Sequence, residues 1–167
     1  MIIRTEEEKD RDAVYRINTM AFESPAEASL VNLLREQAEP YLALVAEIDQ
    51  KVVGHIVFTP VTLNDHSSLK IMGLGPMAVL PEFQRRGVGS ELVRKGMDQC
   101  ELLGADGIIV LGHAEYYPRF GFTPASGFGI TSTYDVPDEV FMAMELKPGA
   151  LQGKSGPANY HPAFSQI

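Results

Sequence analysis

Two apolar runs, at residues 41–48 and 52–62, restrict the fold of this chain most. Both are rich in Val, Ile, Leu and Phe, and only the polar segment Asp49-Gln50-Lys51 separates them. This pattern is typical of an antiparallel hairpin. Because doubly wound nucleotide-binding folds alternate parallel strands with helices from the start, the hairpin argues against that class.

Helical patterns lie on both sides of the hairpin. Thr5-x-x-Glu8 matches a capping box and predicts a first helix, and Ser24-Pro25-Ala26-Glu27 predicts the cap and first turn of a second. Apolar residues at helical spacing predict a third helix over residues 88–103. Further strands are expected near residues 2–4, 70–79, 108–111 and 140–146, and a short helical element over residues 115–119.

The length of 167 residues fits a single domain. A shift to Gly and Pro begins near residue 148, so we expect a domain over residues 1–147 and a C-terminal extension over residues 148–167. Packing on the domain and packing at the interface of a homodimer are both open roles for this extension.

Charge and cysteine content exclude several classes. The chain has 14 Lys and Arg against 22 Asp and Glu, a formal net charge of −8, whereas general nucleic-acid binders need a basic surface. Cys100, the only cysteine, is expected to be a packed thiol and permits neither an internal disulfide nor a multi-cysteine zinc site. The four histidines lack metal-ligand spacing, so we expect no metal.

The sequence also shows no pattern typical of a secretion signal or a membrane helix. The N-terminus turns acidic within a few residues, unlike a secretion signal, and no apolar stretch approaches the ~20 residues of a membrane helix. We therefore expect a cytoplasmic protein without membrane or nucleic-acid partners.

Residues 84–90 combine two arginines and two glycines where a strand is expected to become a helix. Glycines allow close approach of an anion, and the free amides and dipole of a helix N-terminus attract phosphate. The spacing fits neither a P-loop nor the dinucleotide fingerprint, which needs Gly or Ala where Leu92 stands. A helix start with solvated arginines is the structural alternative.

The pattern Met77-Ala78-Val79-Leu80-Pro81 followed by Gln84-Arg85-Arg86-Gly87-Val88-Gly89 resembles the GNAT superfamily of acetyl-CoA-dependent N-acetyltransferases. The later run Tyr117-Pro118-Arg119-Phe120-Gly121-Phe122 extends the resemblance, which covers about residues 2–147. The resemblance implies an α/β (α+β) GNAT fold, with a mixed, mostly antiparallel sheet of about six to seven strands flanked by about four helices. The run around Tyr117 and the closing Tyr160–Phe164 segment look most like predicted bacterial acetyltransferases of unassigned substrate.

The resemblance also implies how acetyl-CoA would bind. The backbone of the strand at Met77, Ala78 and Val79 would hydrogen-bond the pantetheine arm as another strand would. The loop would hold the pyrophosphate, mainly through the amides of its last six residues; its members are Gln84, Arg85, Arg86, Gly87, Val88, Gly89 and Ser90. Pro76 lacks an N–H and marks a bulge or splay beside this strand.

Acetyl transfer to an amine needs a neutral amine and a proton for the leaving thiolate. Tyr117 occupies the position of the family's tyrosine acid; a core aromatic is the structural alternative. The base is unassigned between Glu27, His55, His113, Glu115 and a bound water, because this chain lacks the longer segment that many relatives have before the tyrosine. Two of these candidates also have a structural alternative to the role of base. Glu27 could serve as the carboxylate of a capping box, and His55 could form a buried hydrogen bond.

An N-acetyltransferase acting on a primary amine, more plausibly of a small molecule than of a protein, is the leading interpretation. A non-catalytic acyl-CoA-binding or regulatory module is the alternative, and a nucleotide-binding domain is a third, weaker one. Residues 81–95 carry a net charge of +2 and leave −10 for the rest of the chain. This distribution points to a phosphate-rich ligand at the loop and hints at cationic acceptors elsewhere.

Overall fold

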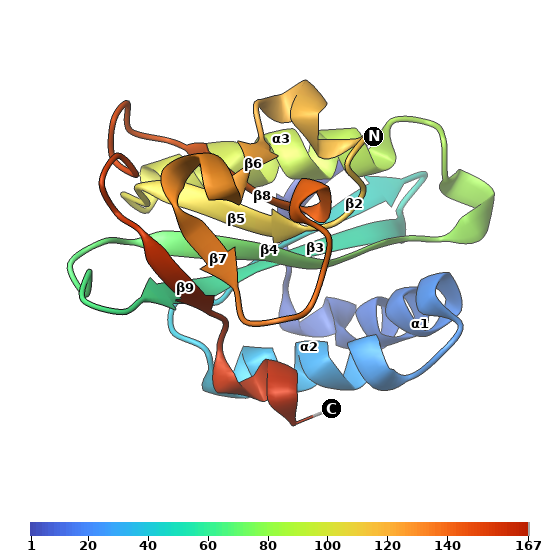
Figure 1. Cartoon of the computed structure of the whole chain (residues 1–167). Helices are drawn as coiled ribbons and strands as arrows, with labels where there is room; N and C mark the ends of the chain where they lie inside the picture. Colours follow the sequence, from blue (N-terminus) through green and yellow to red (C-terminus); the bar gives the residue numbers. More distant parts are fainter. Residues whose placement is uncertain (167) are drawn as a thin grey trace.

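The structure, a computed structural model, describes residues 1–166 as one open sheet covered by helices on both faces (Figure 1). Helices α1 and α2 lie on one face and α3 lies on the other. The helices are α1 (Arg11–Phe22), α2 (Ala26–Gln37) and α3 (Val88–Leu102). The strands are β1 (Ile2–Thr5), β2 (Leu42–Ile48), β3 (Lys51–Leu63), β4 (Ile71–Val79), β5 (Gly107–Leu111), β6 (Thr123–Pro124), β7 (Ile130–Ser132), β8 (Phe141–Glu145) and β9 (Gly156–Asn159).

The main path of the sheet runs β1-β2-β3-β4-β5-β8-β6, and only the β4–β5 pair on this path is parallel. The expected mixed, mostly antiparallel sheet is therefore confirmed. Within residues 1–166 it has nine strands, because the short strands β6, β7 and β9 lie in segments too rich in Gly and Pro for the sequence pattern to show. Three α-helices are present in that range where about four were expected, since the element near residue 117 is a four-residue 3-10 turn, Tyr117–Phe120.

The predicted hairpin, which argued against a doubly wound fold, is confirmed and consists of β2 and β3. Ile48 pairs with Lys51, so the turn itself consists of Asp49 and Gln50. Both turn residues have positive φ, 50° and 64°, as a tight two-residue hairpin turn of type I′ requires.

The two expected helix starts differ in detail from the capping boxes that predicted them. Thr5 pairs with Leu44 in the sheet, so it is not free to cap α1, and the reciprocal box forms between Glu7 and Asp10. Ser24 Oγ does accept a hydrogen bond of 3.2 Å from the Ala26 amide. Glu27 does not complete that second box, because its side chain lies in a cavity described below.

Strand β4 contains the feature that shapes the site. Ile56 pairs with Met77 and Phe58 with Leu74, so one residue of β3 lies opposite the two residues Gly75 and Pro76. This is the bulge that Pro76 predicted. Strand β5 pairs with β4 only over residues 71–74, so the two parallel strands separate beyond the bulge.

A buried ionic cluster ties the end of β1 to α2 and to β2 and β3. Glu6 accepts hydrogen bonds from Arg35 Nε (3.0 Å), from His55 Nε2 (2.8 Å) and from the Tyr41 hydroxyl (3.2 Å). Burial raises the pKa of Glu6, but the hydrogen bonds from His55 and Arg35 outweigh burial and lower this pKa to about 2. His55 is fully buried in this cluster, which favours the buried hydrogen bond considered for it as the alternative to a catalytic role.

Helix α3 approaches β3 closely at Gly96. A Cβ at this position would lie 2.2 Å from Phe58 Cε2, and Phe58 is fully buried. The close contact allows α3 to pack flat on the sheet, with Leu92 and Val93 in the same core as Phe58. Cys100 is in this core too, and burial raises the pKa of its thiol to about 12, so it is a packing residue. No helix within residues 1–166 has the length and apolar character needed to cross a membrane.

The Glu6 cluster predicts a specific loss of stability in acid. A carboxylate whose pKa is 4.5 when unfolded and about 2 when folded contributes stability above pH 4.5, and this contribution disappears as the pH falls through 2. The Glu6→Gln variant should lose roughly 3 kcal/mol of unfolding free energy at pH 7. Its free energy of unfolding should also change less than that of the parent protein between pH 4.5 and 2.

Urea unfolding across this pH range tests the prediction, with Glu36→Gln, exposed on α2, as the control. Equal pH dependence in the parent protein and the Glu6→Gln variant would contradict it.

The Gly96 contact predicts that Gly96→Ala destabilises the fold although alanine favours helix. Overpacking against Phe58 costs typically about 1–3 kcal/mol, while the gain in helix propensity is at most about 1 kcal/mol. Thermal unfolding should show a lower midpoint. Gly127→Ala is the matched control, since its Cβ would have no heavy atom within 4 Å, and a Gly96→Ala midpoint at or above the control's would refute the packing argument.

Candidate functional site

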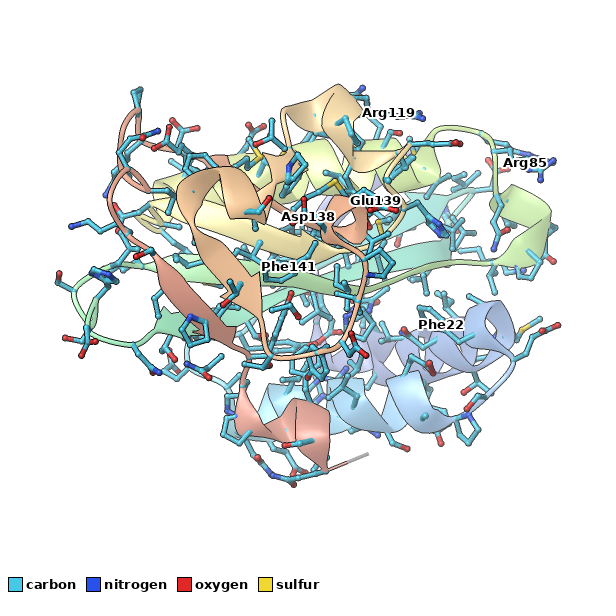
Figure 2. The ribbon with its side chains drawn as sticks, in the orientation of Figure 1. Phe22, Arg85, Arg119, Asp138, Glu139 and Phe141 are labelled. Atoms are coloured by element: carbon cyan, nitrogen blue, oxygen red, sulfur yellow. The ribbon has the colours of Figure 1, made fainter. Side chains whose placement is uncertain are left out.

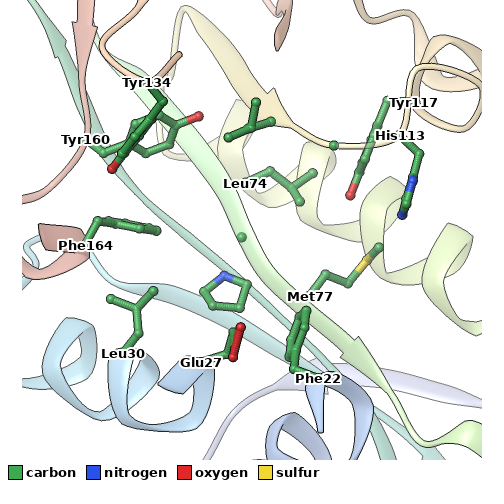
Figure 3. Close-up of a pocket in the computed structure, with 14 residues that line it drawn as sticks. Phe22, Glu27, Leu30, Leu74, Met77, His113, Tyr117, Tyr134, Tyr160 and Phe164 are labelled. Atoms are coloured by element: carbon green, nitrogen blue, oxygen red, sulfur yellow. The ribbon is translucent and has the colours of Figure 1, made fainter. Parts of the chain in front are cut away.

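A cavity of about 550 Å³ lies where β4 and β5 separate (Figure 3). The bulge residues and Met77 line one wall, and Leu111, Gly112 and His113 at the end of β5 line another. Side chains from α1, α2 and the C-terminal segment line the remainder. The splay of the two strands therefore produces a cleft that elements from most of the chain surround.

Beyond the bulge, the backbone of β4 directs groups that have no strand partner toward the side from which β5 has separated. The Leu80 amide donates to the Val53 carbonyl (2.9 Å), so these two residues form a hydrogen-bonded antiparallel pair. Because such pairs alternate along a ladder, His55 and Ala78 form the next one. Met77 and Val79 therefore direct their N–H and C=O groups away from β3, toward the side that β5 has left, and Ala78 directs its own toward β3.

The loop before α3 adjoins this edge. Gln84 Nε2 donates to the Val79 carbonyl (2.9 Å), so the loop is fixed to the end of β4 by a side chain. Arg85 and Gly87 both have positive φ, 63° and 82°, which turns the chain sharply into the helix. Figure 2 shows Arg85 extending from this loop into solvent.

The first turn of α3 offers a set of amides to an anion. Glu91 N–H donates to the Gly87 carbonyl (3.1 Å) as the first bond of the helix, so the amides of Val88, Gly89 and Ser90 have no helical acceptor. Tyr116 Oη lies 3.1 Å from Ser90 Oγ and covers this turn. The residues of the sequence motif therefore have the arrangement of an anion-binding site at a helix N-terminus.

Tyr117 lines the cavity and is buried in an aromatic cluster. Its ring packs against Tyr116, Phe120 and Phe122 with centroid distances of 5.1, 6.4 and 5.7 Å. Burial, and secondarily the neighbouring Tyr116, raises the pKa of Tyr117, so its hydroxyl keeps its proton at neutral pH. A Cβ on Gly112 would lie 2.4 Å from the Tyr117 ring, so glycine is what makes room for the ring there.

Of the four side chains considered as bases, two line the cavity. Glu27 reaches it from α2, and its Oε2 atom is buried without a hydrogen-bond partner among the described residues. His113 is exposed and lies beside Tyr117, across the cavity from Glu27 (Figure 3). His55 lies in the Glu6 cluster, and Glu115 lines a neighbouring cavity of about 520 Å³ together with Glu139.

Two of the lining residues, Phe22 and Tyr134, have no signal in the sequence. Phe22 is the last residue of α1 and Tyr134 lies in a polar loop, and both are partly exposed at the cavity. Tyr160 and Phe164 come from the C-terminal extension, whose strand β9 pairs with β3 and β7. Only the topology of the whole chain brings these aromatic side chains together. No group of three or more His, Cys, Asp or Glu side chains suited to a metal ion occurs in residues 1–166.

The model of the acetyltransferase (GNAT) family matches residues 11–122 of this chain. The chain belongs to the GNAT family. Two Escherichia coli relatives, both described as uncharacterized N-acetyltransferases, support this assignment. YjhQ is 41% identical over 156 residues, covering 88% of this chain and 86% of YjhQ, and YhbS is 32% identical over the full length of both chains.

Solved structures agree. The crystal structure of Escherichia coli YhbS in complex with CoA superposes with a TM-score of 0.91 at 32% identity, covering 98% of this chain and 91% of that chain. A GNAT acetyltransferase from Brucella melitensis in complex with acetyl-CoA gives a TM-score of 0.79 at 33% identity, covering 98% and 97%. The resemblance and the fold expected from it are confirmed, and the chain is an N-acetyltransferase by family.

Proposed function

We propose that this GNAT protein transfers the acetyl group of acetyl-CoA to a primary amine by direct attack in a ternary complex. The observation that carries the proposal is the cleft between β4 and β5, which a free strand edge, a protonated tyrosine and an unpartnered carboxylate oxygen line. Met77 connects this cleft to the N-terminus of α3, because its side chain lies beside Gly89. Both reactants would lie side by side there, which removes much of the entropic barrier of a two-substrate reaction.

In the proposed complex, acetyl-CoA lies along the free edge of β4 and reaches the N-terminus of α3. Met77 and Val79 would hydrogen-bond the amide-bearing arm as a neighbouring strand does, while Ala78 would only pack. The amides of Val88, Gly89 and Ser90 would hold the pyrophosphate, and Arg85 and Arg86 would add attraction at the exposed rim. The complexes of the YhbS and Brucella melitensis proteins with CoA and acetyl-CoA support acetyl-CoA as the ligand.

Acetyl-CoA supplies an activated acetyl group as a thioester. In the proposed reaction a C–N bond to the amine forms and the C–S bond breaks. Tyr117 donates a proton to the departing sulfur, because burial keeps its hydroxyl protonated. Solvent returns that proton to Tyr117 afterwards.

Glu27 is the proposed base. A primary amine is a cation at neutral pH and must lose a proton before it attacks. The unpartnered Oε2 of Glu27 lies in an apolar cavity, where a carboxylate attracts an ammonium group and accepts its proton. His113, at the exposed side of the cavity, is the second proposed proton acceptor and would act once the amine has reached the thioester.

The roles of Tyr117 and Glu27 predict different losses. Tyr117→Phe should lower kcat by about 10- to 1,000-fold while CoA affinity stays within a fewfold, because the ring remains and only the acid is lost.

Glu27→Gln should lower kcat/KM for amines more at pH 7 than at pH 9, because a larger fraction of the amine is neutral at pH 9. Thiol release from acetyl-CoA with a panel of amines measures both.

Tyr116→Phe is the comparison for the acid, since that hydroxyl lies on Ser90 rather than in the cavity. Unchanged turnover in Tyr117→Phe would remove the acid role. CoA binding by the parent protein without turnover of any amine would instead favour a non-catalytic acyl-CoA-binding module.

The proposed phosphate contacts predict salt-dependent binding. Removing both exposed arginines with Arg85→Ala/Arg86→Ala should weaken CoA binding by about 3- to 10-fold at low salt, and the difference should shrink as salt screens the charges. Calorimetry at two ionic strengths measures this. The double variant Arg11→Ala/Arg16→Ala removes the same charge from α1 and should bind normally; equal weakening by both pairs would indicate only a net-charge effect.

A further inference from the structure

The cavity has an aromatic end away from Tyr117 and His113. Tyr134, Tyr160 and Phe164 gather there, while Tyr117 and His113 lie on the other side (Figure 3). The Tyr160 ring packs against both of the other rings in tilted arrangements, at centroid distances of 6.0 Å from Tyr134 and 5.2 Å from Phe164. Leu30 of α2 continues the apolar surface toward Glu27.

Two polar atoms in this apolar surface have no hydrogen-bond partner within residues 1–166. They are Glu27 Oε2 and Tyr160 Oη, both buried, and both residues line the cavity. Buried polar groups in folded proteins are nearly always hydrogen-bonded, so an orphan pair in one cavity indicates groups that a ligand satisfies. A carboxylate oxygen needs a donor, and a phenol needs an oxygen or nitrogen partner.

The lining also argues against strongly polar acceptors. An amino sugar or a polyamine carries more hydroxyl or ammonium groups than Glu27 and Tyr160 can satisfy, and each remaining group would be buried without a partner at a cost. A flat apolar body loses nothing by entering the cavity and gains contact with three aromatic rings. The cavity volume of about 550 Å³ suits a small molecule next to the acetyl-bearing arm.

We propose that the acceptor is a small arylalkylamine that carries an oxygen substituent on its ring. Its ammonium group meets Glu27, its ring packs against Tyr134 and Phe164, and its ring oxygen exchanges a hydrogen bond with the Tyr160 hydroxyl. The C-terminal extension then supplies two specificity-determining residues, Tyr160 and Phe164. This assignment rests on the proposed acetyl transfer and names its substrate class.

Steady-state kinetics with tyramine, phenethylamine, glucosamine and spermidine tests the assignment. Tyramine should give a kcat/KM at least about tenfold above those of glucosamine and spermidine. Phe164→Ala should raise the KM for tyramine about tenfold with little change in kcat or in the KM for acetyl-CoA. Leu102→Ala, at the exposed end of α3, is the control and should change nothing.

The Tyr160 contact has a sharper test. Tyr160→Phe should lower kcat/KM for tyramine about 3- to 10-fold but leave phenethylamine nearly unchanged, because phenethylamine lacks the ring hydroxyl. Equal effects on both amines would overturn the hydrogen bond.

Two outcomes separate this assignment from the proposed function. Efficient turnover of glucosamine or spermidine with inert tyramine would overturn the substrate class and leave acetyl transfer standing. If no amine is acetylated although CoA binds, acetyl transfer fails, and calorimetry of tyramine with the CoA-loaded protein then decides: binding that Phe164→Ala weakens supports the aromatic end as an amine site, and absence of binding overturns it.

Discussion

The bulge at Gly75 and Pro76 determines most of what this molecule offers to ligands. One extra residue in β4 shifts its register against β3, and β5 pairs only with the part of β4 before the bulge. A regular ladder would have satisfied Met77 and Val79 with β5 and filled the space beside them. The separation instead leaves a free strand edge and a cavity of about 550 Å³, and Met77 on that edge lies beside Gly89 in the first turn of α3. Everything proposed about chemistry depends on that separation.

The features that the sequence predicted well are local. The β2–β3 hairpin follows from two apolar runs and a short polar turn, α3 from a long helical period, and the bulge from a proline that has no N–H to contribute to a ladder. The feature that it missed at the start of α1 depends on competition between elements, because Thr5 matches a capping pattern but pairs with Leu44. The short helical element expected over residues 115–119 is present as the 3-10 turn Tyr117–Phe120. Strand β9 has no alternating pattern, because its four residues include Gly156 and Pro157 and it pairs with both β3 and β7.

The residues of the candidate site also differ in whether a local sequence pattern could predict their positions. The loop before α3 was predictable because its glycines and arginines are contiguous, and the tyrosine because its spacing to Gly121 and Phe122 matches a family pattern. The ranking of bases was not, since it depends on long-range packing. His55 became part of the Glu6 cluster, whereas Glu27, which a capping role would have explained, lies in the cavity with an unpartnered oxygen. The aromatic end of the cavity comes from a loop and the C-terminal extension, which no local pattern connects.

The proposed function requires that the β4 edge released by the bulge binds CoA as a strand would. Amide hydrogen exchange followed by NMR, without and with CoA, can test this binding residue by residue. Met77 and Val79 amides, which have no partner on β3, should exchange rapidly in the free protein and become strongly protected by CoA, whereas the Ala78 amide should be protected in both states. Met77 and Val79 amides that exchange equally fast with and without saturating CoA would contradict it.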